Sequence, residues 1–109
     1  MAEKSLQDVL GSNASQTSTQ IFLDKTDIGL SPSESHSADQ IISAIAITAK
    51  PILNQAQFDA EYEQKVYISE GFKSFTSKND GTNDIEHRVD QIVINLAKED
   101  DTSLNPEDY

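Results

Sequence analysis

Two arms rich in β-branched and aromatic residues, 65–77 and 86–98, dominate the pattern of apolar positions along the chain. A polar break between them contains the step Asp80-Gly81. Asp-Gly readily supplies the positive φ angles that tight hairpin connections need. The pattern therefore predicts a long antiparallel β-hairpin with strands at about 65–77 and 86–98.

The apolar residues of the predicted hairpin lie on both of its faces, because side chains alternate along a strand. One face gathers Ile92, Ile94 and Leu96, and the opposite face gathers Tyr67, Val89 and Val93. Gly71 interrupts the first arm, and a glycine inside a strand often marks a β-bulge, which would return Phe75 to the buried face. We expect a helix of the same chain to cover the first face and a partner to contact the second.

A second apolar pattern, from Ala38 to Ala49, has the spacing of a helix. Ser37 and Gln40 match a capping box, in which the serine hydroxyl accepts from the third amide and the glutamine reaches back. Pro51 ends the pattern. Isoleucine alternates with alanine within 43–48, which also suits a strand, and the sequence favours the helix for its first two turns.

The remaining segments carry weaker signals. Residues 54–64 alternate apolar and acidic positions, which favours an extended segment, although Asn54 as a cap would suit a helix. Residues 5–10 match a short helix, with a frayed terminus as the alternative. Residues 11–20 have almost nothing to bury and are typical of a linker or an extended arm, and the apolar patch at 20–23 suits an edge strand or an anchor.

Together these elements predict an α+β fold, in which a small antiparallel sheet is built on the hairpin and accompanied by one short helix at 38–49. A mainly β fold is the alternative. The expected organisation is an N-terminal arm or linker at 1–40 with a possible short helix, a small α+β core at 41–98 and an acidic tail at 99–109.

Charge narrows the possible partners. The 109-residue chain has 19 acidic and 8 basic side chains, a formal net charge of −11, and the acidic excess is greatest at the two ends. Nucleic acid and anionic membranes are not expected partners, because no basic patch is available to neutralise phosphates. The chain has no cysteine, hence no disulfide. We expect no secretory signal, because the first residues lack its basic and then apolar character. We expect a cytoplasmic or virion location.

Candidate catalytic and metal-binding groups are few. His36 lies among Ser35, Ser37 and Asp39, but neighbouring loop residues cannot generally adopt the geometry of a catalytic triad. The loop at 80–86 superficially resembles a calcium loop, yet it lacks the required glycine and glutamate. One further acidic row is typical of a solvated face: Asp59, Glu61 and Glu63. The sequence predicts no enzyme, no catalytic residue, no cofactor and no metal.

The small size of the expected core favours association with other chains. Residues 41–98 number 58, and domains this small are marginal unless a disulfide, a metal or oligomerisation stabilises them. Long arms on a small β-rich body are common in large symmetric assemblies, above all viral shells and phage necks or tails. We therefore predict a non-enzymatic structural subunit of a symmetric homo-oligomer or hetero-assembly, with a virion component (phage capsid, neck or tail) as the leading example.

A soluble acidic adaptor or regulatory binding module, which docks through its acidic tail, is the alternative hypothesis. In either case the expected contacts to protein partners are apolar and aromatic residues of the arms and of the second hairpin face. They are Ile21, Phe22, Leu23, Tyr67, Val89, Val93, Leu104 and Tyr109.

Overall fold

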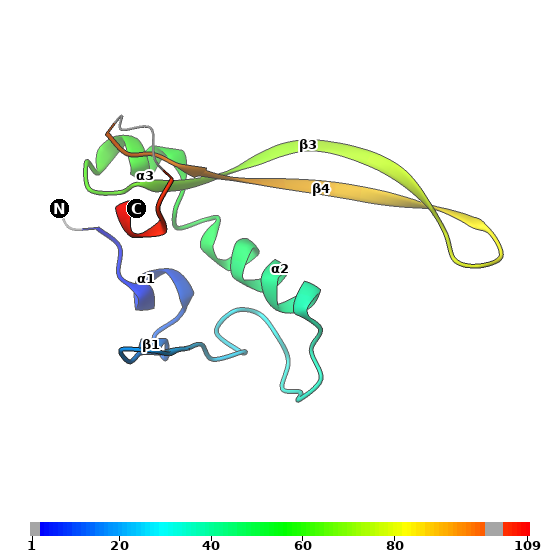
Figure 1. Ribbon diagram of the computed structural model, residues 1–109, viewed down its shortest axis with the longest axis horizontal. Helices are drawn as coiled ribbons and strands as arrows, with labels where there is room; N and C mark the ends of the chain where they lie inside the picture. Colours follow the sequence, from blue (N-terminus) through cyan, green and yellow to red (C-terminus); the bar gives the residue numbers. More distant parts are fainter. Residues whose placement is uncertain (1–2, 100–103) are drawn as a thin grey trace.

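The computed structural model describes residues 3–99 and 104–109 and shows a mixed α/β protein with two antiparallel two-stranded sheets (Figure 1). Along the chain the elements are α1 (Leu6–Leu10), β1 (Ser15–Gln16), β2 (Ile21–Phe22), α2 (Ala38–Ala49), α3 (Gln55–Ala60), β3 (Val66–Asn79), β4 (Asp84–Leu96) and the 3₁₀ helix η1 (Pro106–Asp108). The long hairpin is confirmed. The expectation that one short helix accompanies the hairpin in the core is wrong, because α3 accompanies α2 there.

The helix α2 begins where the capping box predicts. The Ser37 hydroxyl accepts from the Gln40 amide at 3.2 Å, and Gln40 Oε1 accepts from the Ser37 amide at 2.8 Å. These bonds satisfy two backbone donors that the helix itself leaves open. The predicted bounds of 38–49 are confirmed and the strand alternative for 43–48 is wrong. No helix within the described ranges is long and apolar enough to cross a membrane.

A second capping box starts α1. The Ser5 hydroxyl accepts from the Asp8 amide at 3.1 Å, and Asp8 Oδ2 accepts from the Ser5 amide at 3.0 Å. The helix ends at Gly11, whose φ of 108° and ψ of 151° are tolerated almost only by glycine. Because α1 also packs against α2, the short helix predicted for 5–10 is confirmed and the frayed terminus is wrong.

The segment expected to be a linker is tied to α1 and to the turn that contains Asp27 by polar contacts. The Asn13 amide and its Nδ2 both donate to Asp27 Oδ2, at 3.3 and 3.0 Å, and Gln7 Nε2 donates to the Ala14 carbonyl at 2.7 Å. Ala14 and Ile28 are 3% and 4% exposed. The linker interpretation of 11–20 is therefore wrong, since this segment supplies β1 and a buried residue.

The helix α3 replaces the extended segment that was favoured for 54–64. Asn54 Oδ1 accepts from the Gln57 amide at 2.8 Å and thus caps the helix. The Phe58 ring lies 4.7 Å from the Tyr67 ring, centroid to centroid, in a tilted arrangement. The cap and this contact with β3 together favour the helix over the alternating pattern.

The hairpin β3–β4 pairs Val66 with Leu96 at its base and Asn79 with Asp84 at its tip. The strands therefore extend about two residues closer to the tip than predicted. Glu70 pairs with Ile92 and Lys73 with Asp90, so the two residues between them oppose a single residue of β4. This is the bulge that Gly71 predicts.

The buried apolar residues are few and mostly small: Ala14, Ile28, Ala44, Ala49 and Ile68. The helix α2 buries two of these alanines and packs against α1, whereas α3 packs against β3. The expectation that the helix at 38–49 covers the face of Ile92, Ile94 and Leu96 is wrong, because Ile94 and Leu96 are 54% and 50% exposed.

The molecule is elongated and has a large surface for its mass. Its radius of gyration is 16.9 Å, against about 13 Å for a compact domain of this length. Its accessible surface is 8335 Å², whereas a 12.0 kDa monomer exposes about 6,000 Å². Figure 1 shows the main source of the difference, a hairpin that extends beyond the helices along the longest axis.

Candidate interaction surface

The base of the hairpin is supported by the rest of the chain. The Ile68 amide donates to the Leu53 carbonyl at 2.7 Å, so the loop after α2 covers the outer edge of β3 there. Ile68 is only 5% exposed, and Gln64 Nε2 donates to the Val66 carbonyl at 2.8 Å. Tyr67 packs against Phe58 on α3. This part of the hairpin therefore belongs to the folded body.

The bulge marks the end of that support. The Phe72 amide donates to Gln91 Oε1 at 2.9 Å, so a side chain supplies the acceptor that the interrupted ladder lacks. A Cβ atom at position 71 would lie 2.1 Å from the same Oε1. Glycine at this position thus makes room for the side chain of Gln91.

An ion pair anchors the hairpin at the same level. Lys50, which follows the last residue of α2, pairs with Glu70 next to the bulge. The hydrogen bond from Lys50, followed by its charge, holds the pKa of Glu70 below its ordinary value. Because both side chains face solvent, we ascribe to this pair a role in positioning the hairpin more than in overall stability.

Beyond the bulge the chain forms what we name the distal hairpin, residues 72–91. All of its residues are exposed, on both faces, and Figure 1 shows it projecting away from every helix. Phe72 is 87% exposed and Phe75 is 67% exposed, and Ile85 and Val89 are also open to solvent. A two-stranded hairpin without a covering layer is at best marginally stable in water. This projecting ribbon is the strongest candidate for a contact surface.

The tip of the distal hairpin is ordered by its own backbone. Asp80 Oδ1 accepts from the amides of Thr82 and Asn83, at 2.9 and 2.8 Å, and these bonds hold the pKa of Asp80 below its ordinary value. Gly81 takes a φ of 105°, which a residue with a side chain would adopt only under strain. Asp80 is the first residue of the loop at 80–86 that resembles a calcium loop, and its carboxylate is thus hydrogen-bonded to the backbone of that loop.

The two strands of the distal hairpin carry opposite formal charges. From 72 to 79, β3 has Lys73 and Lys78 and no acidic residue. From 84 to 91, β4 has three acidic residues and Arg88, a net charge of −2. Arg88 Nη2 lies 2.9 Å from Asp90 Oδ1 on the same strand, and both side chains remain exposed. The ribbon therefore has one basic and one acidic edge.

The predicted contact residues do not form a single patch. Ile21 (69% exposed), Phe22 (48%) and Leu104 (79%) face solvent, as does Val89 at 38%. The other four are half-buried: Leu23, Tyr67, Val93 and Tyr109. Tyr67 packs on α3, and Lys98 Nζ lies 5.6 Å from the centre of the Tyr109 ring. The pair β1–β2 lies far from the distal hairpin (Figure 1).

Sequence reasoning missed Phe72 and Phe75 as candidate contacts. The predicted first arm places Phe72 on the same face as Val66 and Ile68, and the expected bulge returns Phe75 to that buried face. A signal for their exposure was present: the only apolar residue between 73 and 79 is Phe75, and the only ones between 84 and 90 are Ile85 and Val89. The half of the hairpin nearer its tip is therefore mostly polar, and it offers little apolar surface for a helix of the chain to cover.

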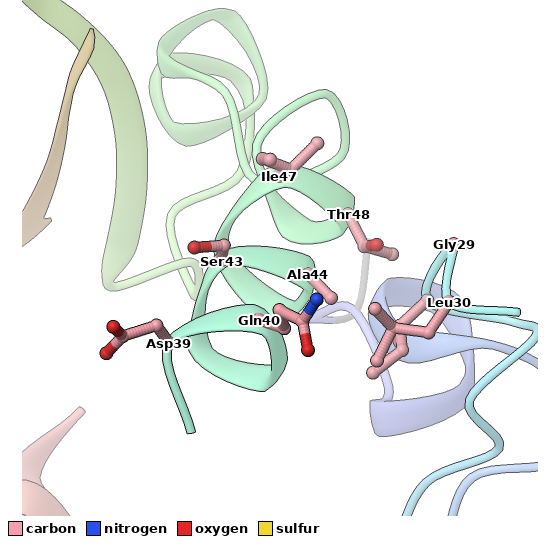
Figure 2. Close-up of a pocket in the computed structure, with 9 residues that line it drawn as sticks. Gly29, Leu30, Asp39, Gln40, Ser43, Ala44, Ile47 and Thr48 are labelled. Carbon is pink, nitrogen blue, oxygen red and sulfur yellow. The ribbon is translucent and has the colours of Figure 1, made fainter. Parts of the chain in front are cut away.

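An open groove of about 430 Å³ lies between α2 and the segment 28–30. Figure 2 shows Leu30 facing Ala44 and Thr48 across it, with Asp39 and Ser43 directed away from Leu30. Its lining is mainly apolar, and Ile47 at its border is 61% exposed. The groove is a second, smaller candidate for contact with an apolar group.

The loop around His36 shows its hydroxyl groups engaged in local structure. The Ser37 hydroxyl caps α2, and the Ser35 hydroxyl lies 3.1 Å from that of Ser33. Nδ1 of the half-buried His36 has no hydrogen-bond partner. In the described parts of the chain, no three His, Cys, Asp or Glu residues gather in a way that could hold a metal ion.

Comparison with known proteins gives no relative. No family model matches the chain, and neither the curated proteins nor the solved structures contain a significant match. Any assignment of function therefore rests on the geometry and charge of the surfaces described above.

Proposed function

We propose that this protein is a non-enzymatic structural subunit of a large symmetric assembly, and that its distal hairpin is the arm that contacts neighbouring subunits. The observation that carries the proposal is the complete exposure of residues 72–91, on both faces of a two-stranded ribbon. An exposed strand edge is prone to pair with another chain. A projecting ribbon with two open edges is thus suited to association.

The surface of the whole molecule supports the same proposal. The chain exposes about 2,300 Å² more than expected for a compact monomer of its mass. A specific protein interface typically buries about 1,200–2,000 Å² in total. The projecting hairpin therefore leaves enough surface for contacts with neighbouring subunits.

Within this proposal, a virion component is the example that we favour. Small bodies with long arms are common in viral shells and in phage necks and tails, and the projecting hairpin provides such an arm. The preference for a virion component rests on this similarity of architecture.

The adaptor hypothesis receives less support from the described end of the tail. Lys98 Nζ lies 3.0 Å from Asp108 Oδ2, and the Tyr109 ring lies over the same ammonium group. Part of the acidic tail is thus engaged by the chain's own lysine. Residues 100–103, which belong to the same predicted tail, lie outside the described residues.

A shortened hairpin tests the proposal. Deletion of residues 74–77 together with 86–89 removes four residues from each strand in register, and it keeps the tip and the alternation of side chains. We expect the full chain to sediment as an oligomer and the shortened variant as a monomer with unchanged helical circular dichroism. All eight deleted residues are exposed, so the body should fold normally.

The matched control removes an exposed apolar side chain elsewhere. Ile42→Ser alters a residue of α2 that is 67% exposed and does not line the groove, and this variant should assemble as the full chain does. A full chain that sediments at 12.0 kDa at every concentration would refute self-assembly, and a shortened variant that assembles normally would refute the role of the hairpin.

A further inference from the structure

The distal hairpin has two outer edges, and the fold leaves both of them open. At the base, the Leu53 carbonyl accepts from the Ile68 amide and thereby covers the edge of β3. Within 72–90, one backbone–backbone hydrogen bond is described besides those that join β3 to β4. It is the turn bond in which the Asp80 amide donates to the Asn83 carbonyl at 3.0 Å. The outward N–H and C=O groups along both strands are therefore available to another strand.

We infer that the partner of these edges is a second copy of this chain, and that β3 of one copy pairs with β4 of the next. This inference rests on the proposed function and specifies how its subunits meet. The projecting hairpins would lie side by side in one antiparallel sheet that continues from copy to copy.

Charge determines which edges meet. The outer part of β3 carries Lys73 and Lys78, a formal charge of +2, and the outer part of β4 carries −2. Pairing β3 with β4 of a neighbour brings opposite charges together. Pairing like strands would bring two basic or two acidic edges together, and like charges opposite one another in a sheet are destabilising.

The direction of the strands agrees with this pairing. In every copy β3 runs from the body to the tip and β4 returns, so hairpins that project the same way place β3 antiparallel to the neighbouring β4. Contacts of this head-to-tail kind form rings when the rotation closes. Closure of the sheet would remove every open edge, and each edge of about seven residues would contribute a contact about 25 Å long.

Charged side chains on an edge strand can also protect it from pairing, because an ammonium group or a carboxylate that loses its water without finding a partner is costly. Here the two edges have opposite signs, so identical copies attract one another in the head-to-tail arrangement. The exposed apolar side chains Phe72, Phe75 and Val89 would then be partly covered by neighbouring strands.

Charge reversal on one strand at a time tests the inference. The variant Lys73→Glu/Lys78→Glu makes both edges acidic, and Glu86→Lys/Asp90→Lys makes both edges basic. We expect each variant alone to associate at least tenfold more weakly than the unaltered chain in sedimentation velocity. An equimolar mixture should assemble again with equal amounts of the two variants, because each acidic edge then meets a basic one.

The possible results separate the inference from the proposed function. Failure of the mixture to assemble, or assembly of each variant alone, would overturn β3–β4 pairing while the assembly of the unaltered chain stands. A mixture that stops at dimers would show that only one edge of each hairpin pairs, and it would also overturn the inference. A monomeric unaltered chain would overturn the proposed function itself. NMR spectra provide the control that the body and the hairpin of each variant are folded, because Lys73 and Asp90 also face each other within one chain.

Discussion

Replacement of Ile68 by alanine is expected to lower the free energy of unfolding by about 2–4 kcal/mol. Ile68 is 5% exposed, at the point where β3 meets the loop after α2, and its amide donates to the Leu53 carbonyl. Removal of three carbon atoms there leaves a cavity that the short surrounding segments can fill only in part. Urea denaturation followed by circular dichroism measures the loss.

The cross-strand neighbour of Ile68 provides the matched control. Ile94 pairs directly with Ile68 in the register of the hairpin but is 54% exposed. Ile94→Ala should cost less than about 1 kcal/mol, because much of its side chain already contacts water. Equal losses for the two variants would show that Ile94 is as buried as the sequence predicts, and the described packing would be wrong.

Replacement of Gly11 by alanine should have the second large effect, about 2–4 kcal/mol. The backbone of Gly11 takes a φ of 108° and a ψ of 151°, which cost roughly 1–3 kcal/mol for other residues. A Cβ atom there would also lie 2.4 Å from Cβ of Asp27, close to the backbone of the facing turn. Thermal and urea unfolding of the variant measure the combined effect.

Gly29→Ala separates backbone strain from steric clash. Gly29 also has a positive φ, 84°, but nothing lies within 4 Å of an added Cβ atom. Its replacement should cost only about 1 kcal/mol. If Gly11→Ala left stability unchanged, residues 11–27 would behave as a free arm, contrary to the contacts between Asn13 and Asp27.

Local signals predicted the elements of this fold well. The capping box of Ser37 and Gln40 determines where α2 begins, and the Asp80-Gly81 step determines where the hairpin turns. Each signal depends on residues at most three positions apart and on local bonds or angles of their backbone. Gly71 likewise predicted the bulge, because a strand interior seldom contains glycine without a local reason.

The contacts between elements could not be predicted in the same way. The sequence suggested that helix 38–49 covers the hairpin, but α2 has alanines on its buried side and packs against α1. For 54–64 the strand and helix patterns coincided, and the Asn54 cap together with the contact between Phe58 and Tyr67 favours the helix. The candidate surface was missed for this reason as well, since the exposure of Phe72 and Phe75 depends on which helix covers which strand.

Amide hydrogen exchange of the unaltered chain, dilute and concentrated, tests most directly whether the distal hairpin is the surface through which copies associate. We predict that outward-facing amides within 73–79 and 84–90 exchange at least tenfold more slowly in the concentrated sample. The Ile68 amide, which is bonded to Leu53 within the chain, should be protected in both samples. Fast exchange of the distal amides at both concentrations, in a chain that sedimentation shows to be assembled, would contradict this and place the contacts elsewhere.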